Sequence, residues 1–340
     1  MRVTGIGHAV PAPIGQRELW DGFFAGRYAG VRSAAQVFAS AGVQTRHTVV
    51  NPAVEDISDW GTEARMRRYL AEALPLGKSA VGAALADAGL TAEDVGLFTV
   101  ATCTGYATPG LDILLARDLG MPADLQRLLV GHMGCYAALP GLAAVTDFVA
   151  ARGRPAVLLC LELTSLHLQP PTTGMDQVVT HALFGDAAAA VVVEPGDGPG
   201  LHLFDVTART DAATADHMTW DVTDQGFRMG LSPRVPAVLG RHVGSVVDDL
   251  LASHGLRRCD VGGWAVHPGG RRIVVVVGRS LDLPDSAMES SYDVLRDYGN
   301  CSSPTVLLVL EALRAKEIAT IVALAFGPGL TLYAGLLRAS

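Results

Sequence analysis

The strongest constraint on the fold of this 340-residue chain is an internal repeat at half its length. In the first half, DVG at 94–96 leads into an apolar run, and Cys135, preceded by a glycine, then opens a helical pattern. In the second half, DVG at 260–262 leads into a similar run, and Asn300, also preceded by a glycine, opens another. Solenoid repeats have periods of roughly 20–50 residues. This longer period predicts a duplicated unit, with Cys135 and Asn300 at equivalent positions that face one site.

Apolar strand-like runs alternate with helical patterns in both halves, which indicates a layered α/β architecture. The DGPG segment at 197–200 is typical of a linker, so we expect one half to span residues 1–198 and the other residues 199–340. The predicted helices are 62–90, 109–119, 136–152, 237–254 and 303–315, and the predicted strands are 95–102, 155–162, 186–194, 261–266, 319–326 and 330–337.

The composition favours a globular protein that acts on small molecules. With 49% hydrophobic and 18% charged residues, the chain can bury a large core. The formal net charge is −8, and basic residues never form a run longer than a pair. Neither a nucleic-acid-binding surface nor a polybasic membrane patch is therefore expected.

The cysteine pattern and the N-terminus predict a cytoplasmic protein that is not exported. Five cysteines are an odd number without CxxC pairing, which supports neither a disulfide framework nor a zinc site. The first residues lack the pattern of a signal peptide, and we find no apolar run of the roughly 20 residues that a membrane span needs.

Cys135 is the candidate nucleophile. It lies in VGHMGCYAALPGL, where a glycine-containing turn runs into a helix. The positive end of a helix favours a thiolate over a thiol, so we expect a nucleophile near neutral pH. Taken alone, the pattern favours a small buried cysteine packed at a helix start, but the flanking glycines and the repeat partner Asn300 favour catalysis.

His267 and Asn300 are the candidate partners of Cys135. His267, in GGWAVHPGG, follows a short apolar strand, at the edge where α/β proteins present functional groups. Asn300, in YGNCSSPTVL, could simply cap the next helix. Together, however, a neutral imidazole and an amide provide two donors for an oxyanion or an enolate.

With these residues placed, the sequence resembles the type III polyketide synthases, the chalcone synthase-like branch of the thiolase superfamily, over nearly its whole length. The motifs that carry the resemblance are GC around Cys135, LFGDAAAAVVV at 183–193, WAVHPGG at 264–270, YGNCSSPTVL at 298–307 and FGPGLT at 326–331. The resemblance implies a thiolase-like αβαβα fold of two duplicated halves with mixed five-stranded sheets. The short chain resembles the bacterial members.

The resemblance also implies an activity: an acyltransferase of secondary metabolite biosynthesis that works as a homodimer. Cys135 would take an acyl starter from coenzyme A, and His267 and Asn300 would promote decarboxylation of malonyl-CoA. Repeated condensation and cyclisation would release a pyrone or a phenolic ring. Coenzyme A thioesters would be substrates, and no cofactor would be needed.

Pocket residues are carried over from the resemblance by position. Phe184 resembles the family's gatekeeper aromatic, and Met229 stands where a second gatekeeper Phe is usual. Trp220 stands where plant members often have Gly, so we expect a smaller cavity and a product that is smaller than, or folded differently from, a tetraketide chalcone. The remaining expected pocket residues are Cys103, Thr104, Thr108, Thr164, His167 and Ser302.

The cations that hold coenzyme A phosphates in plant members are mostly missing. In RSAAQVFASAGVQTRH, only Arg32 and Arg46 are permanent cations. We therefore expect Arg32 and Arg271, with Arg272 beside it, to hold the nucleotide. A donor presented on an acyl carrier protein is the alternative.

Three competing functions share these residues. A ketoacyl synthase III-like enzyme would perform a single condensation or acyl transfer with the same Cys, His and Asn. An acyl-CoA thiol hydrolase would release free acid without consuming malonyl-CoA. A catalytically silent partner subunit is disfavoured by the intact triad.

Overall fold

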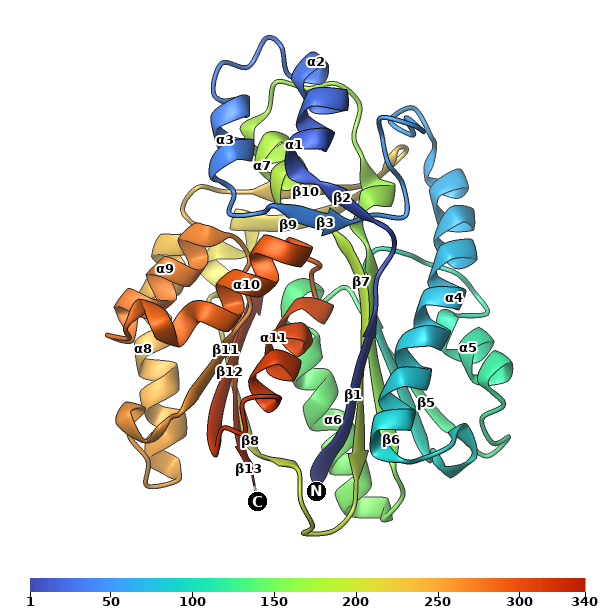
Figure 1. The fold of residues 1–340 in the computed structure, drawn as a ribbon, viewed down its shortest axis with the longest axis vertical. Coiled ribbons are helices and arrows are strands. Elements are labelled where there is room, and N and C mark those ends of the chain that lie inside the picture. Colours follow the sequence, from blue (N-terminus) through green and yellow to red (C-terminus); the bar gives the residue numbers. More distant parts are fainter. Residues whose placement is uncertain (340) are drawn as a thin grey trace.

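A computed structural model describes residues 1–339 and shows the expected layered α/β fold (Figure 1). The strands form one nine-stranded mixed sheet, in which a short antiparallel contact between β1 and β8 joins the two halves. In sheet order, the strands are β11 (Gly263–Val266), β12 (Thr320–Gly327), β13 (Thr331–Ala339), β8 (Leu201–Thr210), β1 (Arg2–Ala9), β7 (Asp186–Glu194), β6 (Ala156–Leu163), β4 (Leu97–Thr102) and β5 (Gln126–Gly131).

The duplication is visible in the strand order. In the first half, β1, β7 and β6 pair antiparallel in turn, and β6 pairs parallel with β4. In the second half, β8, β13 and β12 pair antiparallel in turn, and β12 pairs parallel with β11. Only β5 has no counterpart, so within residues 1–339 the second half contributes four strands to the sheet instead of the predicted five.

The missing strand is replaced by helices. After β11 the chain passes directly into α9 (Arg271–Ser280) and α10 (Glu289–Tyr298). The first turns of α9 contain the run IVVVV, whose β-branched residues favour a strand by propensity. Its residues Ile273, Val274 and Val277 are buried on one helical face, so tertiary packing decides the conformation.

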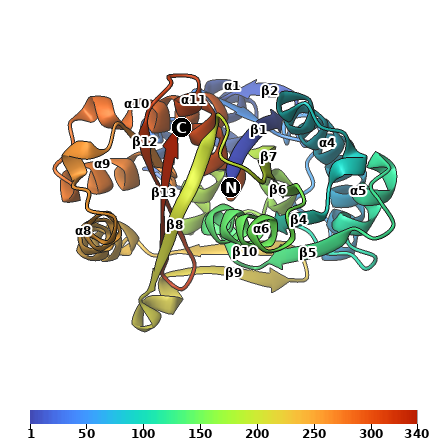
Figure 2. The same cartoon turned by 90° about the horizontal axis from the view of Figure 1, so that it is seen from below.

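Helices fill the remaining layers (Figure 2). The central layer is α6 (Ala138–Arg152) and α11 (Pro304–Arg314), and each of these helices contacts strands of both halves. The outer layers are α4 (Thr62–Ala88) and α5 (Leu111–Leu119) on one side and α8 (Val235–Ser253), α9 and α10 on the other.

The central helix α6 is unusually apolar. Together with the preceding turn, the stretch Gly134–Arg152 is long and apolar enough to cross a membrane by length and composition, contrary to our expectation of no such run. In the structure, Leu139, Leu142, Val145 and Val149 are fully buried in the core between the sheet halves. The apolar character of this stretch is therefore accounted for by its place between two layers of strands.

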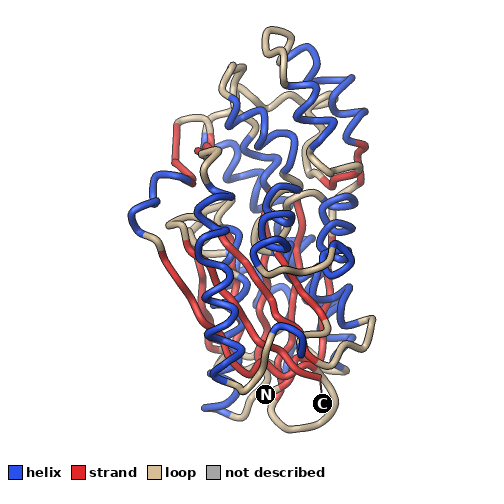
Figure 3. The backbone as a smooth tube through the Cα atoms, turned by 90° about the vertical axis from the view of Figure 1, so that its left-hand side faces the viewer, coloured by secondary structure: helices blue, strands red, loops and turns tan. Residues whose placement is uncertain are grey.

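A cap of shorter elements lies at the end of the molecule opposite both termini (Figures 1 and 3). It covers the edge of the sheet where β4, β6, β11 and β12 end. Its elements are β2 (Pro13–Gly15), α1 (Gln16–Leu19), a π-helical turn (Trp20–Phe24), α2 (Ala25–Arg27), α3 (Ala34–Ser40), β3 (Thr45–His47), α7 (Met175–Leu183), β9 (Met218–Thr223) and β10 (Gly226–Leu231).

All eleven predicted helices and strands are confirmed, with ends that differ by a few residues. The elements not predicted are the strands β1, β5 and β8, the helices α9 and α10, and the cap. The expected boundary at residue 198 lies in the loop between β7 and β8, and this division stays a prediction.

Candidate active site

Cys135 lies in a single 3₁₀ turn, Gly134–Tyr136, immediately before α6. Gly134 has a φ of 72°, and a Cβ there would lie 3.1 Å from the Pro328 side chain. A glycine is therefore needed on both conformational and steric grounds. The turn holds the Cys135 side chain, which is 6% exposed, at the wall of an internal cavity.

His267 directly follows β11 and is 1% exposed. Its backbone N–H donates to the carbonyl of Leu324 at 2.8 Å, which continues the parallel pairing of β11 with β12. The imidazole lies edge to face with Phe326, with ring centroids 6.0 Å apart. Within the described residues, neither ring nitrogen has a hydrogen-bond partner, so both are available to a substrate.

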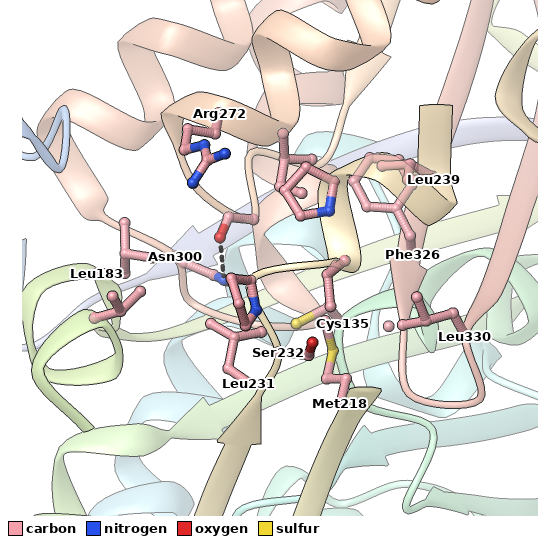
Figure 4. A pocket seen from close by; sticks show the side chains of 18 of the residues that line it. Cys135, Leu183, Met218, Leu231, Ser232, Leu239, Arg272, Asn300, Phe326 and Leu330 are labelled. Carbon is pink, nitrogen blue, oxygen red and sulfur yellow. Dashed lines mark hydrogen bonds between the residues drawn. The ribbon is translucent and has the colours of Figure 1, made fainter. Parts of the chain in front are cut away.

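Asn300 is held by the backbone on both sides. Its N–H donates to Leu183 at 2.8 Å, and its carbonyl accepts from Gly185 at 3.0 Å. Its side-chain Oδ1 accepts the N–H of Ser302 at 2.8 Å, which fixes the amide with Nδ2 as its donor. Nδ2 lies 3.5 Å from the Gly269 carbonyl (Figure 4).

The structure brings Cys135, His267 and Asn300 together in the wall of one cavity of about 490 Å³. Each of the three comes from a different element, and two of them precede the central helices α6 and α11. Phe184 and Met229, the expected gate positions, line the same cavity. The remaining lining is mostly apolar and comes from α3, α7, α8, the start of α9 and the loop between β12 and β13.

Burial controls the ionisation of the site. It raises the pKa of the Cys135 thiol to about 11, although hydrogen bonds from Ser302 and Asn300 act in the opposite direction. Burial also lowers the pKa of His267 to about 3. The expected thiolate at the helix start is therefore not the resting state, because loss of hydration outweighs the helix end. Both shifts favour a neutral thiol and a neutral imidazole near pH 7.

A much smaller pocket lies beside Cys135. It has a volume of about 30 Å³, and its lining includes the predicted residues Cys103, Thr104, Thr164, Trp220 and Ser302. A third pocket, of about 60 Å³, is lined by Thr164 and Trp220 together with the predicted His167. Phe184 and Met229 border all three spaces.

Of the predicted pocket residues, Trp220 lines the small pockets and Thr108 does not. Trp220 is fixed, since its Nε1 donates to the Cys103 carbonyl at 2.9 Å and its ring meets His167 edge to face at 5.3 Å. Thr108, by contrast, is exposed and lines none of the three described spaces. The prediction for Thr108 is wrong for the single chain because it lies beyond β4 in an outward loop.

The arginines considered for coenzyme A binding differ in whether they reach the large cavity. Arg271 and Arg272 line the large cavity, whereas Arg32 is exposed and does not. Arg46 is 3% exposed, and its guanidinium donates to the carbonyls of His181 and Phe184 and to Gln16. It is a structural cation and is not available to a nucleotide.

Sequence reasoning missed Glu162. This carboxylate is fully buried in β6 and accepts from the backbone N–H groups of Cys103 and Thr104 at 3.0 and 3.1 Å and from Ser303 at 2.9 Å. Burial raises its pKa, and these hydrogen bonds act in the opposite direction. The available signal was a lone acidic residue in the apolar run AVLLCLEL, since a buried carboxylate needs partners.

Comparison with known proteins identifies the family. Residues 3–199 match the family model for the N-terminal domain of chalcone and stilbene synthases, and residues 207–340 match the one for the C-terminal domain. The chain belongs to the chalcone and stilbene synthase family. It is a type III polyketide synthase, an acyltransferase that condenses acyl-CoA substrates.

Relatives of this synthase include two bacterial enzymes. It is 38% identical over 307 residues to 1,3,6,8-tetrahydroxynaphthalene synthase of Streptomyces peucetius subsp. caesius, covering 86% of this chain and 80% of the relative. It is 32% identical to 3,5-dihydroxyphenylacetyl-CoA synthase of Streptomyces toyocaensis, covering 99% of this chain and 90% of that one.

Solved structures agree in fold. The tetrahydroxynaphthalene synthase of Streptomyces coelicolor A3(2), a bacterial type III polyketide synthase, superposes with a TM-score of 0.91 at 27% identity, covering 100% of this chain and 99% of that one. The synthase PKS-I of the brown alga Ectocarpus siliculosus gives a TM-score of 0.93 at 28% identity, covering 99% and 98%. The thiolase-type fold is confirmed.

Proposed function

We propose that Cys135 is the nucleophile that takes the acyl starter. The neutral His267 imidazole would accept the thiol proton as the sulfur attacks the starter thioester carbonyl, and the coenzyme A thiol would leave with that proton. Ser302 and Asn300, whose hydrogen bonds favour the thiolate, would stabilise the sulfur during the transfer.

In the extension step, the same His267 and Asn300 would bind the thioester carbonyl of malonyl-CoA. Loss of CO₂ leaves an enolate oxygen, which Nδ2 of Asn300 and an N–H of His267 would stabilise. The enolate carbon would then attack the Cys135 thioester, and the thiolate would leave. The observation that supports this best is that the thiol, the imidazole and the amide share one buried cavity in which His267 stays neutral.

Coenzyme A fits the chemistry of the cavity rim. Arg271 and Arg272 begin α9, and among the described residues neither guanidinium has an ion-pair partner. Arg271 packs its stem against Gly42, just beyond α3, where a Cβ would lie 3.5 Å from it. Two unpaired cations at the positive end of a helix suit phosphate groups. We propose that they hold the coenzyme A phosphates, with a carrier-protein donor as the alternative.

We also propose a cytoplasmic homodimer. β5 is an edge strand that pairs only with β4, and its residues 126–129 are all exposed. Leu128 and Leu129 are 41% and 45% exposed, and Tyr106 and Ile113 are exposed nearby in sequence. An exposed edge strand offers unpaired backbone groups to another chain, and Leu128 and Leu129 add apolar surface, so a second copy would join here.

The small pocket beside Cys135 supports a short product. At about 30 Å³ it has room for two or three water molecules, at roughly 10–15 Å³ each. A pyrone or other small ring after few extensions fits this limit better than a tetraketide. A single condensation, as in a ketoacyl synthase III-like enzyme, is the alternative.

The deciding experiment incubates the protein with malonyl-CoA and a panel of acyl-CoA starters and identifies the products by mass. Ring products support the proposal, one linear ketoacyl product supports single condensation, and free acid without malonyl-CoA consumption supports a hydrolase. Intact-mass spectrometry should show a starter on the wild-type protein and none on Cys135→Ala. Asn300→Ala should load a starter but release little CO₂ from malonyl-CoA, whereas His267→Ala, which also lacks the base for the Cys135 thiol, should be slow in both steps.

A further inference from the structure

The large cavity extends to both sides of Cys135. One side runs between α3, α7 and the start of α9, toward Arg271 and Arg272. The other side lies under α8, against β13 and the loop that precedes it. In Figure 4, Leu183 and Arg272 lie on one side of Cys135, and Leu239 and Leu330 lie on the other.

The side under α8 is apolar. Its lining from the core consists of Met218, Val238, Leu239, Phe326, Leu330 and Leu332. All of them except Met218 are at most 9% exposed, and they belong to one hydrophobic cluster between α8 and the strands β12 and β13. An empty cavity lined in this way forfeits van der Waals contacts and excludes water, so an apolar group gains free energy by filling it.

Few polar side chains line this side of the cavity, and one of them, Thr331 of β13, shares a hydrogen bond of 2.9 Å with Thr210. In addition, α8 contributes His242 and β8 contributes the exposed Arg209. His242 is already occupied, because its Nε2 shares a hydrogen bond of 3.0 Å with Asp211. An occupant would therefore meet mainly apolar walls.

We propose that the channel between α8 and β13 binds the unbranched aliphatic chain of the acyl starter while its carbonyl is attached to Cys135. This inference rests on the proposed function and names its substrate class. The pocket behind Cys135 cannot take such a chain, since it measures about 30 Å³ and Trp220 is fixed across it. The starter tail and the growing polyketide would thus occupy different spaces.

The test compares acetyl-CoA with dodecanoyl-CoA as starters, each with malonyl-CoA. Leu239→Trp narrows the channel and should lower the ratio of kcat/KM for dodecanoyl-CoA to that for acetyl-CoA by about ten-fold or more, the size expected when a pocket rejects excess chain. Leu332→Ala widens it and should shift the preferred starter to a longer chain. Ser245→Trp places the same residue on an exposed position of α8 and should leave the ratio unchanged.

The outcomes separate this inference from the proposed function. A ratio that stays constant in both Leu239→Trp and Leu332→Ala, in folded protein, overturns the channel assignment but leaves the synthase activity intact. A wild-type protein that condenses acetyl-CoA but rejects every aliphatic starter longer than four carbons overturns it as well. A wild-type protein that consumes no malonyl-CoA with any of the starters contradicts the proposed function itself.

Discussion

The neutral state of His267 predicts a pH-dependent stability difference that a single substitution isolates. The ordinary His pKa is 6.5, and burial lowers that of His267 to about 3. Between these values the unfolded chain binds a proton that the folded protein does not. The stability contributed by this site is therefore fully present above pH 6.5 and falls as the pH drops toward 3.

The size of the effect follows from the shift. Below pH 6.5, the pKa of His267 in the unfolded chain, each further pH unit lowers the free energy of unfolding by about 1.4 kcal/mol. His267 should therefore lower the free energy of unfolding by about 2 kcal/mol between pH 8 and pH 5. The variant His267→Gln lacks the titrating group. Its stability relative to the wild type should therefore rise by about 2 kcal/mol over the same interval.

The assay is urea unfolding of both proteins at pH 8, 6.5 and 5, at one protein concentration so that any subunit dissociation contributes equally. His167 and His181 are buried with similarly lowered pKa values, but they are common to both proteins and cancel in the difference. If the difference did not change with pH, His267 would be able to hold a proton in the folded state. An ion pair with a Cys135 thiolate would then replace the neutral pair deduced above.

Three further predictions concern other parts of the molecule. Arg46→Met leaves two buried carbonyls without their donor and should lower the free energy of unfolding by about 3 kcal/mol, measured by urea unfolding, whereas the exposed Arg32→Met should change it by less than about 0.5 kcal/mol. Gly134→Ala forces a positive φ and a 3.1 Å contact with Pro328; it should destabilise by about 1–2 kcal/mol and slow starter loading in intact-mass time courses. Trp220→Gly should yield products at least one malonyl-derived unit longer by mass spectrometry, and an unchanged product would show that the small pocket does not limit extension.

The repeat made the main features of the site predictable. Cys135 and Asn300 occupy equivalent places before α6 and α11, and the matching strands on each side of them give the same sheet order twice. Equal residue spacings between matching elements indicate that the two halves fold alike, which is why the positions of Cys135 and Asn300 could be predicted from the sequence. The absence of a counterpart of β5 in the second half was not predictable in the same way. The Val-rich segment at the start of α9 favours a strand by propensity, and it is helical because one of its faces is buried.

Burial was the property that the sequence could not supply. Arg32 and Arg46 are alike as residue types, but Arg46 lies inside the cap and binds backbone carbonyls. The same limit applies to Cys135, where the helix start was visible and the surrounding desolvation was not. Glu162 is the reverse case, since its lone charge in an apolar strand was a usable signal of a buried hydrogen-bond network that our sequence analysis missed.

The backbone connection between Phe184 and Asn300 limits how the cavity can open. The two residues form a parallel bridge, in which Asn300 donates to Leu183 and Gly185 donates to Asn300. A backbone shift at Phe184 would therefore displace the amide that stabilises the enolate. We expect Phe184 to admit substrates by rotating its side chain about a fixed backbone. Met229 has no such tie to the triad, since its carbonyl accepts only from Gln177 at 2.7 Å among the side chains described. A shift of Met229 is therefore expected to change the cavity shape without displacing Asn300.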